Sequence, residues 1–289
     1  MGNRRKIRRF NVTIIILFNI LLCKVNFQSL NLPKNSYNLS SHGSSIKFAC
    51  NISDIANNYN YSTTLLKYPD NIYLYNISIK NKYHITILDY GTFEDKINNN
   101  VLHSFQSYEL LGMSFYSKSI NEKYKIAIAA GVVYSKIDKF YSNAIFTDIG
   151  FFANSKKKNL NLNLTIKNLG IVINEYSNSK EYMPIKIQFG ILKVFQNQSL
   201  VLAYDFLYDT GYHFAKHIAS LKKELNNNLF LIMGINSINQ DLKINNTMND
   251  LLAGLAIGVI ITNDMMDVGL GTSYLGPAGY VYGLTFSFK

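Results

Sequence analysis

The end of the chain alternates between large apolar and small or polar side chains. In positions 266–274 and 280–288 the even positions carry mostly Met, Val, Leu, Tyr or Phe, and the odd positions mostly Gly, Ser, Thr or Asp. Strand side chains point alternately to opposite faces, so each run predicts a strand with one apolar face. Pro and Gly in 275–279 favour a turn between the two strands. An apolar terminal hairpin is typical of a membrane β-barrel that closes on itself, because lipid cannot satisfy a free sheet edge. The closing signal, which the barrel-assembly machinery would read, is expected at Tyr282, Leu284, Phe286 and Phe288.

The beginning of the chain has the pattern of a secretory signal peptide. Five Lys or Arg lie in positions 4–9, and the apolar run 12–22 is shorter than the about 20 residues that a membrane helix needs. We expect cleavage between Lys24 and Leu30. Residues 1–29 are then the signal peptide, and residues 30–289 form one outer-membrane barrel domain.

The two cysteines leave a lipoprotein alternative open. Cys23 follows the apolar run and could be acylated, although Leu22 before it is bulkier than the small residue that such sites usually carry. Without lipidation the mature chain keeps one thiol, Cys50, and has no internal disulfide.

More than half of the formal charge of +11 lies in the N-terminal segment 1–29, which is expected to be removed as the signal peptide. Residues 1–29 hold six Lys or Arg and no acid, which leaves a charge of about +5 spread over the mature chain. This pattern suits solvated loops and lipid head groups, so we expect outer-membrane lipids and no nucleic acid among the partners. The chain has no Trp but 21 Tyr and 18 Phe, which can form the aromatic belts of a membrane protein.

Alternation recurs along the chain and predicts an all-β, antiparallel transmembrane barrel of about 14 strands, most of them about 8 to 12 residues long. Apolar residues nowhere keep a helical spacing, so helices should be few. The expected strands are 46–51, 72–79, 83–93, 107–117, 124–135, 144–153, 159–172, 184–194, 199–208, 213–221, 229–237, 251–262, 265–274 and 279–288.

The expected connections alternate in length as well. Even-numbered connections are mostly short, whereas longer loops are expected near 53–71, 94–106 and 238–250. Short periplasmic turns, longer outer loops and both termini inside are typical of outer-membrane barrels. A secreted β-sandwich also alternates. Against it stand the long continuous strands and the concentration of Gly and Ala on the face opposite the large apolar residues.

Polar residues on the small-residue face are expected to point into the barrel. They could hold strands together across the interior or line a polar path, and they form no ring of a single sign that would predict ion selectivity. Glycines on the same face, such as Gly258, Gly269 and Gly271, would relieve crowding where strands curve. The candidate lumen-facing residues are Lys125, Asp148, Asn161, Asn163, Lys167, Asp205 and Asp267.

No catalytic pattern accompanies the five histidines: the chain contains neither a Gly-x-Ser-x-Gly elbow nor a His-Glu-x-x-His helix. His213 and His217 form the only close pair, and on one strand they would lie about 13 Å apart, too far for one ion. We therefore expect no enzyme, no metal site and no cofactor.

Short Gly-based motifs occur at 91–93, 141–150, 166–170, 183–191 and 279–288. They resemble the Asp-x-Gly strand, the Lys-Asn-Leu/Ile-Gly strand end, the Leu-Pro strand and the closing Gly…Phe strand of PorV/PorQ-type outer-membrane proteins, a branch of the FadL-like barrels, and of a related uncharacterised spirochaete family.

The FadL-like resemblance implies passage or lateral delivery of hydrophobic small molecules. The PorV/PorQ resemblance implies a membrane partner of a secretion or surface-assembly system, and the longer loops leave open a surface-exposed structural or adhesin barrel. FadL transporters carry an N-terminal hatch inside the barrel. Here only residues 30–45 precede the first expected strand, which argues against a hatch-gated mechanism.

Overall fold

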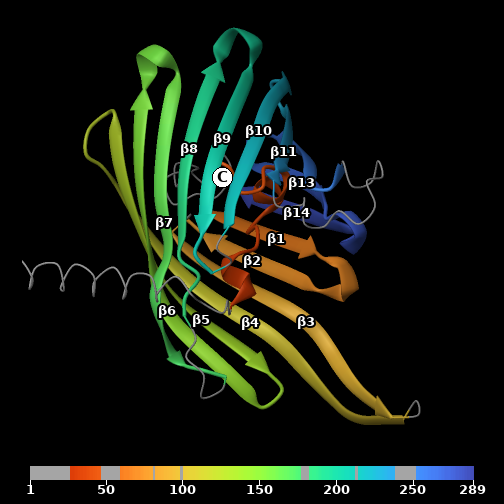
Figure 1. The fold of residues 1–289 in the computed structure, drawn as a ribbon. Helices are drawn as coiled ribbons and strands as arrows, with labels where there is room; N and C mark the ends of the chain where they lie inside the picture. Colours follow the sequence, from red (N-terminus) through yellow and green to blue (C-terminus); the bar gives the residue numbers. More distant parts are fainter. Residues whose placement is uncertain are drawn as a thin grey trace, which may run out of the picture.

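The computed structural model is a closed barrel of 14 antiparallel strands, each hydrogen-bonded to its neighbours in sequence (Figure 1). It describes residues 27–46, 59–80, 82–97, 100–176, 182–211, 214–237 and 252–289. The strands are β1 (Tyr61–Lys67), β2 (Tyr73–Ile79), β3 (Tyr83–Ile97), β4 (Asn100–Ser119), β5 (Tyr124–Ile137), β6 (Phe140–Ser155), β7 (Leu160–Asn174), β8 (Lys186–Phe195), β9 (Leu200–Asp209), β10 (Phe214–Asn226), β11 (Leu229–Asn236), β12 (Leu255–Thr262), β13 (Met266–Tyr274) and β14 (Tyr280–Phe288). β1 pairs with β14 and closes the ring. The expected all-β barrel of about 14 strands is confirmed.

Helices are short in the described part of the chain. Two precede the barrel, η1 (Gln28–Leu30) and α2 (Ser36–Ser40), and single turns η3 (Pro69–Asn71), η4 (Lys156–Lys158), η5 (Gln196–Gln198) and η7 (Gly276–Ala278) lie between strands. None of the helices formed by the described residues has the length and the apolar character needed to cross a membrane.

Burial along the strands follows the sequence alternation. On β14, Val281 and Thr285 point inward and are buried, whereas Tyr282 points outward and is 56% exposed. Large apolar side chains such as Ile128 and Leu270 are exposed on strands all around the barrel. A continuous apolar outer surface is stable in lipid and not in water, and a β-sandwich would turn these side chains inward.

The connections give the barrel two different ends. At one end of the barrel β1 begins and β14 finishes. We call it the short-turn end, and it carries the even-numbered connections 80–82, 120–123, 156–159, 196–199, 227–228 and 263–265. The opposite end, which we call the long-loop end, carries the two longest connections, 175–185 and 237–254.

The first strand lies later in the chain than expected. The expected strand 46–51 lies outside the described residues except for Ile46, which is buried inside the barrel against β8 and β9. β1 lies instead within the expected loop 53–71. Polar residues at 62–64 interrupt the apolar alternation of β1, so its sequence does not have the pattern of a lipid-facing strand.

The expected loop 94–106 is mostly the outer part of a long hairpin formed by β3 and β4. β2 pairs with β3 only as far as Asp89, and β5 pairs with β4 only from Ser107, so the hairpin projects beyond the rim as a two-stranded ribbon (Figure 1). At its base Gly91 has φ 81° and donates its N–H to the Asp89 carboxylate at 2.8 Å. The expected loop 238–250 lies outside the described residues.

Candidate functional site

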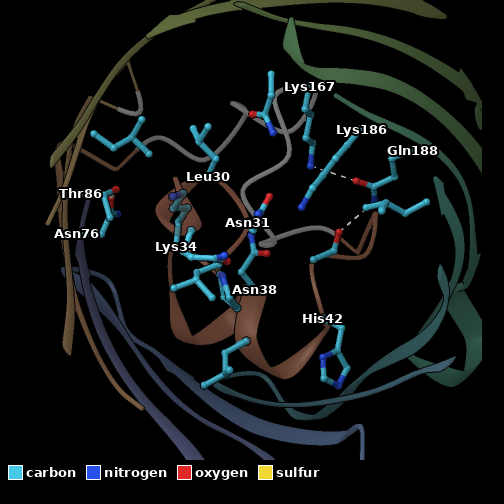
Figure 2. Close-up of a pocket in the computed structure, with 18 of the residues that line it drawn as sticks. Leu30, Asn31, Lys34, Asn38, His42, Asn76, Thr86, Lys167, Lys186 and Gln188 are labelled. Carbon is cyan, nitrogen blue, oxygen red and sulfur yellow. Dashed lines mark hydrogen bonds between the residues drawn. The ribbon is translucent and has the colours of Figure 1, made fainter. Parts of the chain in front are cut away.

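Residues 27–46 lie inside the barrel, and we call this segment the plug (Figures 1 and 2). Its helix α2 packs against β11, β12, β13 and β14, and η1 packs against β3 and β4. Every residue of α2 is buried. The sequence argument against a hatch, that only residues 30–45 precede the first expected strand, therefore does not hold. It followed from placing the first strand too early.

Glycines on the inner face of the wall make room for the plug helix. A Cβ at Gly271 would lie 2.5 Å from Ser40 Oγ and 2.6 Å from Ser36 O. A Cβ at Gly269 would lie 2.1 Å from the ring of Tyr37. Glycine at these positions allows the close approach of α2. The expected role of these glycines, relief of crowding where strands curve, gives way to this one.

Two buried carboxylates of the wall bind the two ends of the plug. Glu109 on β4 accepts the backbone N–H groups of Gln28 at 3.1 Å and Ser29 at 2.8 Å. Asp205 on β9 accepts the backbone N–H of Ser45 at 2.8 Å and also its hydroxyl. A buried carboxylate that loses its donors is strongly destabilised, so these bonds tie the position of the plug to the wall.

The plug itself carries one histidine and one lysine. The amide of Asn236 donates to His42 Nδ1 at 2.9 Å, and His42 Nε2 lies 2.7 Å from the carbonyl oxygen of Gly254. Burial lowers the pKa of His42 to about 3, so the ring is neutral at pH 7 and donates from Nε2. Burial also lowers the pKa of Lys34 to about 7, although the nearby carboxylate of Glu109 acts in the opposite direction and raises it.

A cavity of about 640 Å³ remains between the plug and the wall. Part of its lining is apolar, with Leu30 from the plug, Leu111 and Met113 from β4, and Phe146 from β6. Leu111 and Phe146 also pack in a buried cluster with Phe27 at the start of the plug. The plug and the cavity therefore share one apolar wall.

Another part of the cavity lining is basic. Lys167, Lys186 and Gln188 extend from β7 and β8 into the lumen, as Figure 2 shows. Lys167 donates to Gln188 Oε1 at 3.1 Å, and Lys186 lies 3.4 Å from the carboxylate of Asp209. Lys216 of β10 also lines the cavity. One ligand in this cavity would meet an apolar surface, the lysine side chains and the carboxyl groups of Asp148 and Asp209.

The structure places the seven candidate residues at different depths of the inner face. Asp148, Asn163, Asp205 and Asp267 are buried, and Lys167 lines the cavity. Asn161 and Lys125 are half-buried near the short-turn end. Only Asp148 and Lys167 contribute to the lining of the cavity, while the other buried ones bind the plug or neighbouring residues.

Sequence reasoning missed Glu109, Lys186, Gln188 and Asp209. Each occupies an inward position of its strand, so the alternation used for the other candidates could have found them. Their partners in the plug could not be found this way, since the plug has no strand periodicity.

The hydrogen-bond ladder between β6 and β7 is interrupted at Asp148. The register shifts between Thr147 and Ile149. Opposite, Asn168 has φ 62° and donates its backbone N–H to Asp148 Oδ1 at 2.6 Å, and its side-chain amide donates to the carbonyl of Pro184 at 2.9 Å. We call this interruption the β6–β7 bulge. The sequence motifs at 141–150 and 166–170 meet here.

An apolar groove of about 800 Å³ lies on the outer wall beside the β6–β7 bulge. Outward residues that line it include Val132, Ile145 and Leu169. The groove and the lumen cavity share Met113 and Phe146 in their linings. The two spaces therefore lie on opposite sides of the same part of the wall.

The wall between these two spaces is poor in side chains. Gly112 on β4, Gly131 on β5 and Gly170 on β7 line the groove. A Cβ at Gly131 would lie 2.6 Å from the ring of Phe146, so this ring covers the glycine. The groove and the cavity are thus separated mainly by the side chain of Phe146 and by the strand backbone.

Comparison with protein-family models gives no match, and comparison with curated proteins gives none either. Among solved structures, the toluene transporter TbuX of Ralstonia pickettii is 8% identical, with 91% of this chain and 100% of that chain covered and a TM-score of 0.52. The toluene transporter TodX of Pseudomonas putida is 10% identical, with 92% and 98% covered and a TM-score of 0.50. A FadL homologue of Pseudomonas aeruginosa is 9% identical, with 92% and 98% covered and a TM-score of 0.46.

These likenesses show the fold. The chain shares its fold, a closed antiparallel β-barrel, with the toluene transporters TodX and TbuX. The resemblance to PorV/PorQ-type proteins and to the spirochaete family stays a prediction.

Proposed function

We propose that the protein passes small hydrophobic or amphipathic molecules into the outer membrane. They enter the lumen cavity and leave sideways through the wall at the β6–β7 bulge. The observation that carries this proposal is that the lumen cavity and the outer groove lie on either side of this one interruption. The plug lies in the lumen, so a route along the barrel axis is obstructed, whereas a sideways route passes beside the plug.

The character of the cavity supports this substrate class. A molecule with an apolar body would pack on Leu111, Met113 and Phe146, and an acidic head group would meet Lys167 and Lys186. Apolar pockets with a few fixed polar groups are the common form of small-molecule sites. TodX and TbuX, which share the fold, are described as toluene transporters, and this supports a small apolar substrate.

Targeting belongs to the same proposal. The signal peptide at 1–29 would direct the chain across the inner membrane, and the assembly machinery would insert it with the short turns toward the periplasm. Phe27 and Ser29 are buried in the plug, so we expect cleavage before Phe27, inside the interval proposed from sequence, which shortens the signal peptide from 1–29 to 1–26. No catalysis and no cofactor are part of this function.

A second candidate function is a membrane partner of a secretion or surface-assembly system. The observation that favours it is the β3–β4 ribbon, whose strands pair only with each other beyond the rim. Such a ribbon offers two edges to an extended segment of a partner. A surface-exposed structural barrel would use the same feature.

Clamping the β6–β7 bulge is expected to stop uptake. Thr147 and Leu169 are paired neighbours beside the bulge, and cysteines at both positions would be joined by a short thiol cross-linker in a Cys50→Ser chain. The link holds the strands together where the proposed route crosses the wall. Uptake of radiolabelled toluene and decanoate is measured in cells that display the protein and lack other hydrocarbon channels.

The matched control links cysteines at Phe151 and Leu164, a pair of the same two strands away from the bulge. We expect this link to leave uptake unchanged, and cleavage of the linker at 147 and 169 to restore it. Normal uptake with the bulge clamped would show that the route lies elsewhere. Equal uptake with and without the protein would contradict passage of these molecules altogether and would favour the partner function.

A further inference from the structure

On the outer wall, where β1 closes the barrel, a lysine lies between two tyrosines. Lys67, the last residue of β1, pairs with Tyr282 of β14 on one side and with Tyr73 of β2 on the other. Lys67 Nζ lies 6.0 Å from the ring centroid of Tyr73. Tyr75 lies 6.3 Å from Tyr73, and Tyr280 lies 6.2 Å from Tyr282, so the ammonium group has stacked rings on both sides.

A second outward lysine with a tyrosine on each neighbouring strand lies across β4, β5 and β6. Lys136 near the end of β5 pairs with Tyr108 of β4 and with Tyr141 of β6. The ring of Tyr134 lies 6.3 Å from Tyr108 and 6.1 Å from Tyr141. Both lysine sites therefore face outward, lie at the long-loop end and have aromatic neighbours on both adjacent strands.

Their charge is not neutralised by the described part of the protein. Among the described residues, neither Lys67 nor Lys136 forms a salt bridge, whereas Lys156, Lys186 and Lys289 do. Each ammonium group can donate to an anionic oxygen, and the flanking tyrosine hydroxyls can donate to a second one.

An apolar surface begins directly beside each site. Leu65, next to Lys67 on the same face of β1, pairs with Tyr75 and Leu284. Leu110 pairs with Tyr134 beside the second site and is 40% exposed. Tyrosine rings sit at the head-group level of a membrane, and a lysine at that level extends its ammonium group toward the phosphates. At each site a lysine therefore lies directly beside an apolar strand surface on which acyl chains can pack.

We propose that Lys67 and Lys136 each bind the phosphate group of a membrane lipid in the leaflet at the long-loop end, with the acyl chains lying on the apolar strand surface below. Charge complementarity selects the phosphate, and the adjoining apolar surface selects a lipid over a free anion. Both sites lie outside the lumen and the β6–β7 bulge, so the inference does not depend on the proposed transport route.

Native mass spectrometry of the detergent-purified mature protein tests this proposal, with bisphosphorylated lipid A as the probe and the same lipid without phosphates as the comparison. We expect the barrel to retain two molecules of lipid A. Lys67→Gln and Lys136→Gln should each lose one, with about tenfold weaker binding at the changed site, because a hydrogen bond to a charged group is removed. Lys67→Arg should keep both.

Lys118→Gln is the matched control, because Lys118 is exposed at the short-turn end and pairs with Ile126 rather than with a tyrosine. It should retain lipid A like the unchanged protein. Heat-modifiable migration on a gel checks that each variant is folded. Equal retention by the double variant Lys67→Gln and Lys136→Gln, equal retention of the lipid without phosphates, or displacement by inorganic phosphate alone would each overturn the proposal.

Discussion

Deletion of residues 286–289 should leave the protein unable to insert into the outer membrane. These residues pair with β1 at Tyr61 and Thr63 on one side and with β13 at Met266 and Val268 on the other. Their loss opens the closing seam, and lipid cannot satisfy the exposed backbone groups. The deletion also removes Phe286 and Phe288 from the expected closing signal. Fractionation of membranes and heat-modifiable migration would measure the effect, which we expect to be complete.

Deletion of Lys289 alone is the matched control. Lys289 Nζ donates to the carbonyl of Asn263 at 2.6 Å and lies 3.1 Å from the carboxylate of Asp267, but it follows the last paired residue, Phe288. Its removal should leave insertion unchanged. If the protein without 286–289 reached the outer membrane at the normal level, the closing role of this strand would be wrong.

Deletion of residues 27–46 should convert the barrel into a conducting pore. The plug occupies the lumen except for the cavity beside it, and its removal exposes inward carboxylates such as Glu109 and Asp205 to water. Hydration would then replace the hydrogen bonds that the plug donates, so the barrel itself should still close. We expect a large rise in the ion conductance of planar bilayers.

A milder variant tests the position of the plug in the full chain. Leu at Gly271 would occupy the space of Ser36 and Ser40, and the closest atoms to its Cβ all belong to the plug. Gly271→Leu should therefore loosen the plug and raise conductance partway. Thr272→Leu places the same side chain on the outward face of the same strand and should behave like the unchanged protein. A folded barrel without 27–46 that conducted no better than the full chain would contradict a plugged lumen.

The sequence pattern identified strands wherever the outward residues are large and apolar. β14 is the clearest case, because Tyr280, Tyr282 and Phe288 all face outward. The pattern did not identify β1, because its outward Thr63 is polar and its inward neighbours Ser62 and Thr64 are polar as well, so the two faces do not differ there. Alternation reports the contrast between two faces, so a strand that is polar on both faces near one end does not produce it.

The candidate site could be predicted only in part. Inward residues such as Asp148 and Asp205 follow from strand parity, but their partners Asn168 and Ser45 are set by a bulge and by the plug. Both depend on contacts between residues far apart in the chain, which a local pattern does not contain. The glycines opposite α2 gave a signal, but without the plug it could not be distinguished from strand curvature.

Thiol labelling at two adjacent positions of β7 tests the central claim, a membrane barrel with its N-terminal segment in the lumen. Leu164 is 42% exposed on the outer face, whereas Asn163 is 2% exposed and donates to Ser45 Oγ in the plug at 3.1 Å. In a Cys50→Ser chain, a cysteine at 164 should react with a lipid-soluble maleimide and not with a water-soluble one. A cysteine at 163 should resist the water-soluble reagent in the full chain and react once 27–46 is deleted. Water-soluble labelling at 164, or equal labelling at 163 with and without 27–46, would contradict the account.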